Sequence, residues 1–361
     1  MEPLEIVRRR LAAQRLVGAA HSSPAEVVTH LGAMQAQEFG EALWSVAQRM
    51  GGASEADVEA AFARGEILRT HVLRPTWHFV AAEDLPWIIR LSGPRVHAKN
   101  RHRYRNLGLD DDRLLAQAHE VLREAVAGGR AQTRRELAAA LERHGIGVEG
   151  QRLVHIVMSA ELAGVLCSGP RRGRDHTYML LEERAPSVAE RSREEAVAEL
   201  AGRYFCSRGP ATARDFSAWS GLTVADARQG AGAAPGVAEL FRHDDEPFYG
   251  DPSQMDGDPG EAALLLATYD EVLMGYGPRL RLVFDAESAR GQEPGRVIVI
   301  NGRAVGEWRR RLGARQVVIE VDLFRPLESD EERALLREAE RLGRFFGRDA
   351  RLTVPAGRGG A

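Results

Sequence analysis

The strongest constraint on the fold is a pattern of elements that occurs three times along the chain. Each occurrence has three segments with helical periodicity, followed by two short apolar segments that predict strands. The three stretches run from about Glu5 to Arg90, Asp111 to Glu183 and Ser192 to Tyr249. Helices joined by tight turns and followed by a β-hairpin are typical of a winged helix. The pattern therefore predicts an α+β protein with three tandem winged-helix modules.

Local signals support the predicted helix starts. Ser23 precedes a proline and an apolar run, and Thr133 opens a capping box that ends at a glutamate three residues later. Gly221 separates two further starts of this kind, at Thr212 and Thr223. A helix, a glycine turn and a second helix predict a helix-turn-helix, which elsewhere places a recognition helix in a DNA groove.

The remaining chain predicts strands and one long helix. Asn301-Gly302 between two apolar runs is the strongest hairpin signal in the sequence. We also expect a strand near Leu280 and a helix over 330–346. The predicted domains are winged helices over 1–106, 107–188 and 189–260, a C-terminal α/β portion over 261–354 and a disordered tail over 355–361.

Composition limits the class of protein. The 361 residues carry a formal net charge of −3, which argues against a basic protein that coats DNA regardless of sequence. A local basic face still allows DNA binding. No apolar run approaches the roughly 18 residues of a membrane span, and the N-terminus does not resemble a signal peptide. With only Cys167 and Cys206 as thiols, we expect a cytoplasmic protein that does not enter a membrane.

Familiar catalytic motifs are missing from the sequence. It contains no HExxH, no P-loop, no Gly-x-Gly-x-x-Gly between a strand and a helix, and no Gly-x-Ser-x-Gly. We therefore expect no metal and no cofactor. The most unusual polar pair is Gln35 and Gln37, which flank Ala36 in the first module. If a helix ends near Gly40, both side chains can reach one cleft; the alternative is a solvated helix end.

Several segments, in the same order, resemble the AlkZ/YcaQ family of winged-helix DNA glycosylases. They are Gln35-Ala36-Gln37, Trp44, His71–His78, Ala267–Tyr276 and Ile298–Trp308. The resemblance covers about residues 5–350. It implies a C-shaped fold with DNA in the concavity and Gln35 and Gln37 as catalytic residues. The motif ends in glutamine, as in the AlkZ type, and not in the aspartate of the YcaQ type. The AlkZ type excises bulky N7-alkylpurines, unhooks interstrand crosslinks and confers self-resistance to DNA-alkylating natural products.

Glutamine chemistry agrees with such a substrate. Alkylation at N7 gives the purine a positive charge and makes it a good leaving group, so a positioned water and an oriented dipole suffice. A glutamine does not titrate, which makes it a weak base for a neutral lesion. We therefore expect excision of N7- or N3-alkylated purines. Lys99 is the only lysine, and a lyase needs an amine for its Schiff base. The expected enzyme is monofunctional and leaves an abasic site for base excision repair.

Candidate DNA contacts lie in three places. Arg69, Arg74 and His78 belong to the first predicted wing, although a buried core position is an equally good interpretation of His78. Lys99 and Arg101 belong to a basic run in a predicted polar linker; this run can contact phosphates or pair with Asp110–Asp112. The third group is the hairpin of Arg303, Trp308 and Arg309, which either probes a lesion or packs as sheet.

The sequence also allows other interpretations. Tyr269, Asp270, Glu271 and Tyr276 match the family pattern, but the sequence does not assign them a structural or a cleft-lining role. A transcription regulator or a non-cutting lesion sensor would also keep the basic wing tips. Three modules in one chain need no dimer to read DNA, so we expect a monomer that binds double-stranded DNA carrying alkylated purines.

Overall fold

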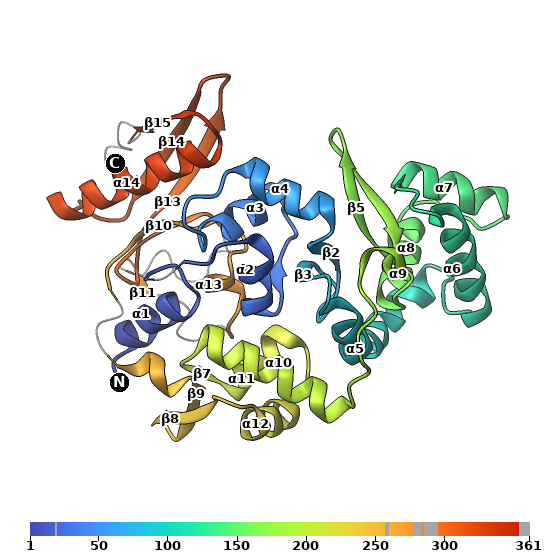
Figure 1. Ribbon diagram of the computed structural model, residues 1–361, viewed down its shortest axis with the longest axis horizontal. Helices are drawn as coiled ribbons and strands as arrows, with labels where there is room; N and C mark the ends of the chain where they lie inside the picture. Colours follow the sequence, from blue (N-terminus) through green and yellow to red (C-terminus); the bar gives the residue numbers. More distant parts are fainter. Residues whose placement is uncertain (19, 257–259, 278–282, 285–294, 354–361) are drawn as a thin grey trace.

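The computed structural model describes residues 1–18, 20–256, 260–277, 283–284 and 295–353. Figure 1 shows the N-terminal elements in blue at the centre, with the segments that follow arranged around them. The expected tail over 355–361 and the expected strand near Leu280 lie outside the described residues. None of the described helices is long and apolar enough to cross a membrane.

The first repeat unit follows α1 (Pro3–Ala13) and contains three helices and three strands. These are α2 (Pro24–Leu31), β1 (Met34–Gln35), α3 (Phe39–Ala47), α4 (Glu55–Arg64), β2 (Ile67–His71) and β3 (Trp77–Ala81). The strands form an antiparallel sheet in the order β1-β3-β2. Ser23 caps α2 by accepting the Glu26 N–H, and Ser54 forms a capping box with Asp57 at the start of α4.

The second and third repeat units have the same order of elements and the same sheet topology. The second contains α6 (Asp112–Val126), β4 (Gln132–Thr133), α7 (Arg134–Arg143), α8 (Arg152–Leu162), β5 (Leu166–Arg172) and β6 (Asp175–Leu180). The third contains α10 (Arg193–Arg208), β7 (Ala211–Thr212), α11 (Ala213–Ser220), α12 (Val224–Ala233), β8 (Ala238–His243) and β9 (Glu246–Gly250). Their sheets have the orders β4-β6-β5 and β7-β9-β8. In each unit the short first strand pairs with the last strand, a detail that the sequence did not predict.

The C-terminal portion is a six-stranded sheet with one long helix. Its elements are β10 (Ala263–Leu265), α13 (Glu271–Met274), β11 (Val283–Phe284), β12 (Val297–Ile300), β13 (Arg303–Leu312), β14 (Gln316–Leu323), α14 (Ser329–Phe345) and β15 (Asp349–Thr353). The sheet order is β10-β12-β13-β14-β15, with β11 beside β13. The Asn301-Gly302 hairpin is confirmed: Ile300 pairs with Arg303, and both turn residues have positive φ.

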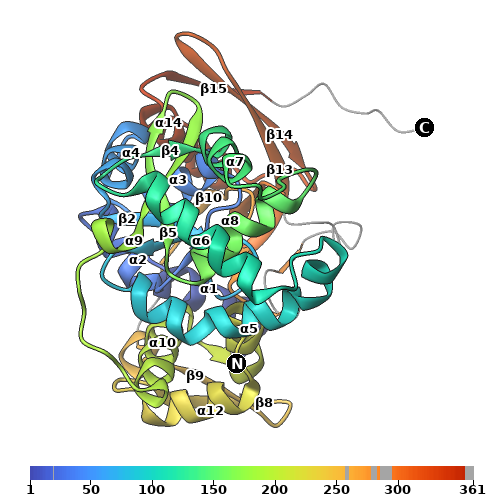
Figure 2. The same ribbon diagram turned by 90° about the vertical axis from the view of Figure 1, so that its right-hand side faces the viewer.

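The linker expected around residues 95–105 is a helix instead. Residues 85–106 form α5 (Leu85–Asn106), which continues through Gly93 and Pro94. A Cβ at Gly93 would lie 2.7 Å from the carbonyl oxygen of Leu162, so this glycine allows α5 to pack closely against α8. The long helix therefore connects the first repeat unit to the second by direct packing (Figure 2).

The first repeat unit shares its apolar core with the other three parts of the chain. Trp44 of α3 packs in one cluster with Leu265 and Phe345 of the C-terminal portion. Leu68 of β2 packs in another cluster with Cys167 of the second repeat unit and Leu200 of the third. The sheet of the first repeat unit therefore packs against other parts of the chain, and residues from those parts surround Gln35.

Candidate active site

The Gln35-Ala36-Gln37 motif lies between two helices and includes part of a strand. Helix α2 already ends at Leu31, where Gly32 adopts a φ of 72°, and Gly40 lies inside α3. The expectation that a helix carries the motif and ends near Gly40 was therefore wrong. Gln35 is the second residue of β1 and pairs with His78 of β3, and Gln37 follows in the loop before α3.

Gln35 is held through both its backbone and its side chain. Gln35 is 7% exposed. The backbone N–H donates to Oε1 of Glu271 over 2.6 Å, and the side-chain Oε1 accepts a hydrogen bond from Nη2 of Arg74 over 2.9 Å. An amide oxygen has two lone pairs, so it can still accept a hydrogen bond from a water molecule.

Gln37 is exposed, and the backbone around it is fixed. Its Oε1 accepts a hydrogen bond from the Trp77 N–H over 3.4 Å. The Ala36 N–H donates to the carbonyl oxygen of Trp77 over 2.7 Å. Nε and Nη2 of Arg69 donate to the carbonyl oxygens of Ala36 and Gln37 over 2.8 and 3.3 Å. The motif therefore presents one buried and one exposed amide on a backbone that β3 and Arg69 hold in place.

Arg69 brings a positive charge to the edge of the motif. Its guanidinium lies 4.2 Å from the centre of the Trp77 ring, a favourable cation–π arrangement. Burial lowers the pKa of Arg69 to about 10, so the side chain stays charged at neutral pH. The backbone N–H of Arg69 also donates to Oγ of Ser168 on β5, which ties the first repeat unit to the second.

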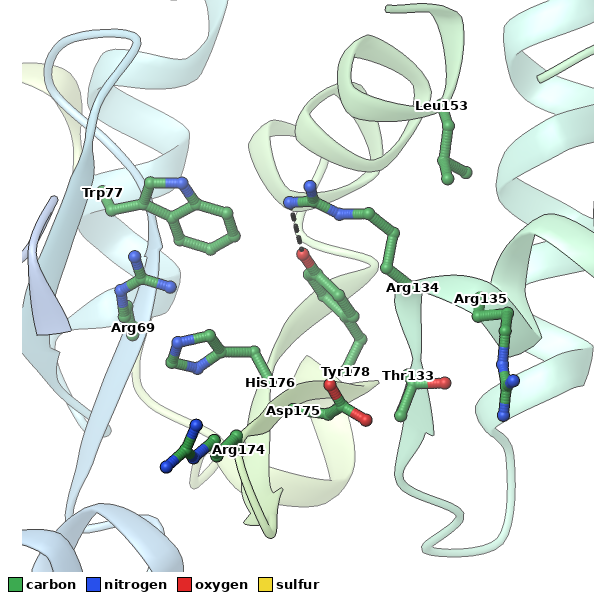
Figure 3. Close-up of a pocket in the computed structure, with 10 residues that line it drawn as sticks. All are labelled: Arg69, Trp77, Thr133, Arg134, Arg135, Leu153, Arg174, Asp175, His176 and Tyr178. Carbon is green, nitrogen blue, oxygen red and sulfur yellow. Dashed lines mark hydrogen bonds between the residues drawn. The ribbon is translucent and has the colours of Figure 1, made fainter. Parts of the chain in front are cut away.

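A cleft of about 760 Å³ opens between these two units (Figure 3). Its walls are Arg69, Trp77, Thr133, Arg134, Arg135, Leu153, Arg174, Asp175, His176 and Tyr178. Arginines outnumber carboxylates in this lining, and Arg134 donates to the Tyr178 hydroxyl over 3.4 Å. Because Trp77 also contacts Gln37, the cleft lies beside the glutamine motif. Its positive charge and aromatic faces suit the backbone and bases of nucleic acid.

The DNA contacts predicted from the sequence do not include the cleft residues of the second repeat unit. Thr133 ends β4 as Gln35 ends β1, so Arg134 and Arg135 occupy the place in their unit that Ala36 and Gln37 occupy in the first. The capping box at Thr133 marks that place in the sequence. A comparison of the repeats would have drawn attention to both arginines.

Asp270 and Glu271 are buried ion-pair partners of arginines. Asp270 accepts hydrogen bonds from Arg49 and from the Ser45 hydroxyl. Burial alone would raise the pKa of Asp270, but the Arg49 guanidinium and the hydrogen bonds bring a net lowering. Glu271 pairs with Arg208 over 2.7 Å. The sequence did not assign a role to this acidic pair; the structure places both carboxylates in the core.

Two predicted DNA contacts need correction. Trp308 is 2% exposed and its indole N–H donates to the carbonyl oxygen of Leu266, so it belongs to the core. His78 is fully buried, its Nδ1 lies 2.9 Å from the carbonyl oxygen of Thr76, and burial lowers its pKa well below 6.5. Neither side chain is at the surface where DNA would bind.

The other predicted contacts lie on separate elements. Arg69 and Arg74 form hydrogen bonds with the glutamine motif. Lys99 and Arg101 are exposed on α5, and Arg303 and Arg309 are exposed on β13. None of these last four lines the cleft beside Gln37. Among the residues that the structure describes, no cluster of three or more His, Cys, Asp or Glu is suited to a metal ion.

Comparison with known proteins identifies a family. The family model described as "DNA glycosylase AlkZ-like" matches residues 28–345. The solved structure of Streptomyces sahachiroi DNA glycosylase AlkZ is similar to the whole chain, with a TM-score of 0.77 and 21% identity. The similarity covers 97% of this chain and 98% of that chain. At this identity the likeness shows the fold. No curated protein matches the sequence.

Proposed function

The chain belongs to the AlkZ-like DNA glycosylases, and from this premise we propose that it hydrolyses the N-glycosidic bond of purines alkylated at N7 or N3. The observation that carries the proposal is the motif itself: Gln35 and Gln37 are neutral amides at the edge of a positively charged cleft. Neutral amides can orient a water molecule, but they are weak acids and bases. Such a site suits a base that is already a good leaving group.

The proposed reaction needs little from the protein beyond positioning. The bond between C1′ and the base nitrogen breaks, and its electron pair neutralises the positive charge of the alkylated purine. The sugar passes through an oxocarbenium-like state, and the oxygen of a water molecule then bonds to C1′. The amide oxygens of Gln35 and Gln37 accept hydrogen bonds from that water and place partial negative charge near the sugar cation. The water proton is released to solvent.

The repeat units support a DNA-binding role. We propose that the three units are winged helices, because each has helices followed by a strand pair and the same three-stranded sheet. Double-stranded DNA would lie along the cleft between the first two units, in contact with Arg134, Arg135 and Arg174. The open cleft, of about 760 Å³, leaves room for bulky adducts and for crosslinked purines. A single chain with three such units acts as a monomer in this proposal, in the cytoplasm.

Base release from a defined duplex tests the proposal. Wild-type protein and the double variant Gln35→Ala/Gln37→Ala are incubated with a duplex that contains one N7-methylguanine, and alkali then converts abasic sites into strand breaks. We expect release by the wild type and none by the double variant, with similar duplex binding. If neither this duplex nor one with an N7-linked interstrand crosslink loses a base although the wild type binds, the substrate assignment is wrong.

A further inference from the structure

We propose that Glu271 is a positioning residue for base excision, because it fixes the backbone of Gln35 from behind the active site. This inference rests on the proposed function and adds a residue that does not line the cleft. Glu271 begins α13, 236 residues after Gln35 in the chain, and is 1% exposed. Its carboxylate faces β1.

The chemistry of the contact requires a carboxylate. Oε1 of Glu271 accepts the Gln35 N–H over 2.6 Å, and Oε2 accepts hydrogen bonds from Nη2 of Arg208 over 2.7 Å and from Nε1 of Trp219 over 3.1 Å. All three partners are donors, and an ionised carboxylate only accepts. A glutamine in this place would direct its NH₂ group at one of them. A side chain of the same shape with only one acceptor oxygen therefore cannot replace Glu271.

The geometry of β1 explains why Gln35 needs such a partner. β1 has two residues and lies at the edge of its sheet. Successive N–H groups of a strand point to opposite sides. The Ala36 N–H bonds to Trp77 of β3, so the Gln35 N–H points away from the sheet. Glu271 takes the place of a missing neighbouring strand at this edge.

Arg208 extends the support along the same segment. Its Nη1 donates to the carbonyl oxygen of Leu31 over 2.7 Å, and its Nη2 donates to that of Ala33 over 2.9 Å. Arg208 ends α10 of the third repeat unit and Glu271 belongs to the C-terminal portion. One buried ion pair thus holds the carbonyl groups before Gln35 and the N–H of Gln35 itself. The segment that carries the catalytic amide is set by residues from two distant parts of the chain.

The neighbouring carboxylate offers a matched control. Asp270 is also 1% exposed and also pairs with a buried arginine, Arg49. The described hydrogen bonds of its carboxylate come from Arg49, Ser45 and the Val272 N–H, and none comes from Gln35. Asp270→Asn therefore disturbs a buried ion pair without touching the motif, whereas Glu271→Gln disturbs both.

The test compares these two variants in the full-length protein. For each we would measure thermal unfolding, affinity for an N7-methylguanine duplex, and the single-turnover rate of base release at a temperature where the protein is folded. We expect both variants to unfold at lower temperature. Only Glu271→Gln should release base more slowly, by about 10²-fold, because small misplacements of catalytic groups have effects of this size. Its duplex affinity should stay within about twofold of the wild type, since Glu271 does not line the cleft.

A measurement on the wild type covers the case in which Glu271→Gln does not fold. The short hydrogen bond to Glu271 predicts slow hydrogen exchange at the Gln35 N–H, although Gln35 lies in a two-residue edge strand. Rapid exchange at that N–H would overturn the proposal, as would equal rates of base release in folded Glu271→Gln and Asp270→Asn. If the wild type itself releases no base, the proposed function fails instead, and the exchange measurement still tests the contact.

Discussion

Nη2 of Arg74 donates a hydrogen bond to the side-chain oxygen of Gln35, and the two atoms are 2.9 Å apart. Arg74 comes from the turn between β2 and β3, so the hairpin of the first repeat unit directly contacts the glutamine motif. The bond fixes which end of the amide carries the oxygen. It also polarises the amide, which strengthens the N–H groups as donors and leaves the second lone pair of the oxygen for water.

Replacement of Arg74 should therefore slow base release. A hydrogen bond from a charged donor contributes about 1.5–3 kcal/mol, which corresponds to about 10- to 100-fold in rate if the orientation matters in the transition state. We expect a loss in this range for Arg74→Met in single-turnover experiments. Arg64→Met, at the exposed end of α4, serves as the control. A wild-type rate in Arg74→Met would show that the bond does not orient Gln35 for catalysis.

The arginines of the cleft should govern the salt dependence of DNA binding. Each phosphate contact contributes roughly 0.9 to the slope of log K against log salt concentration. Arg134→Gln/Arg135→Gln should thus reduce the slope by up to about 2 and weaken binding to damaged and undamaged duplexes alike. Arg337→Gln, an exposed substitution on α14, should leave the slope unchanged. An unaltered slope in the double variant would place the DNA elsewhere on the surface.

Lys99 should have no part in the chemistry. It is the only lysine, and it lies on α5 and does not line the cleft. We expect no strand cleavage before alkali treatment, no covalent complex after reduction with borohydride, and a wild-type rate for Lys99→Arg. A trapped complex that disappears in Lys99→Arg would instead assign a lyase activity to this residue.

Stability should fall as the solution becomes acidic. Burial lowers the pKa of His30, His119 and His176 to about 4, whereas in the unfolded chain these residues titrate near 6.5. Between these values the unfolded state binds more protons than the folded state. Their contribution is complete above pH 6.5 and is lost as the pH falls towards 4. The free energy of unfolding then decreases by up to about 1.4 kcal/mol per pH unit for each histidine that is protonated in the unfolded state and neutral in the folded state.

Urea unfolding at pH 7 and pH 5 measures this effect. Glu338 opposes it in part, since burial raises the pKa of its carboxyl group. His119→Gln keeps a side chain that can reach Ser159, the partner of His119 at 3.0 Å, and should make the pH dependence shallower. Equal stability at pH 7 and pH 5 would contradict the expectation.

Local features of the fold were predictable because their causes are local. The capping boxes at Thr133, Thr212 and Thr223 and the Asn301-Gly302 turn depend on residues within three or four positions of one another. Part of helix α5 was mistaken for a linker on the strength of its basic, polar composition, and the helix contains Gly93 and Pro94, residue types that usually end helices. In this chain the packing of Gly93 against Leu162 outweighs that local preference.

The surroundings of the site were much less accessible to sequence reasoning. The sequence motif singles out Gln35 and Gln37, and a catalytic role for them is what the resemblance to a family implies. The contact between Glu271 and Gln35 joins residues 236 positions apart, and no spacing rule relates them. The burial of Trp308 could not be predicted from the sequence either. An alternating strand pattern does not show which face of the strand packs against α14 and which faces water.

The shared cores of the first repeat unit restrict how such enzymes can be recombined. A fragment that ends after α5 would expose the apolar surfaces that Leu200, Leu265 and Phe345 now cover. It would also remove Glu271, the acceptor of the Gln35 N–H. Although the chain repeats its architecture, the first repeat unit cannot be moved into another protein by itself. A chimera meant to exchange substrate preference should therefore replace the second repeat unit, which supplies the far wall of the cleft. It should preserve the contacts that Cys167 and Leu162 of this unit make with the rest of the chain.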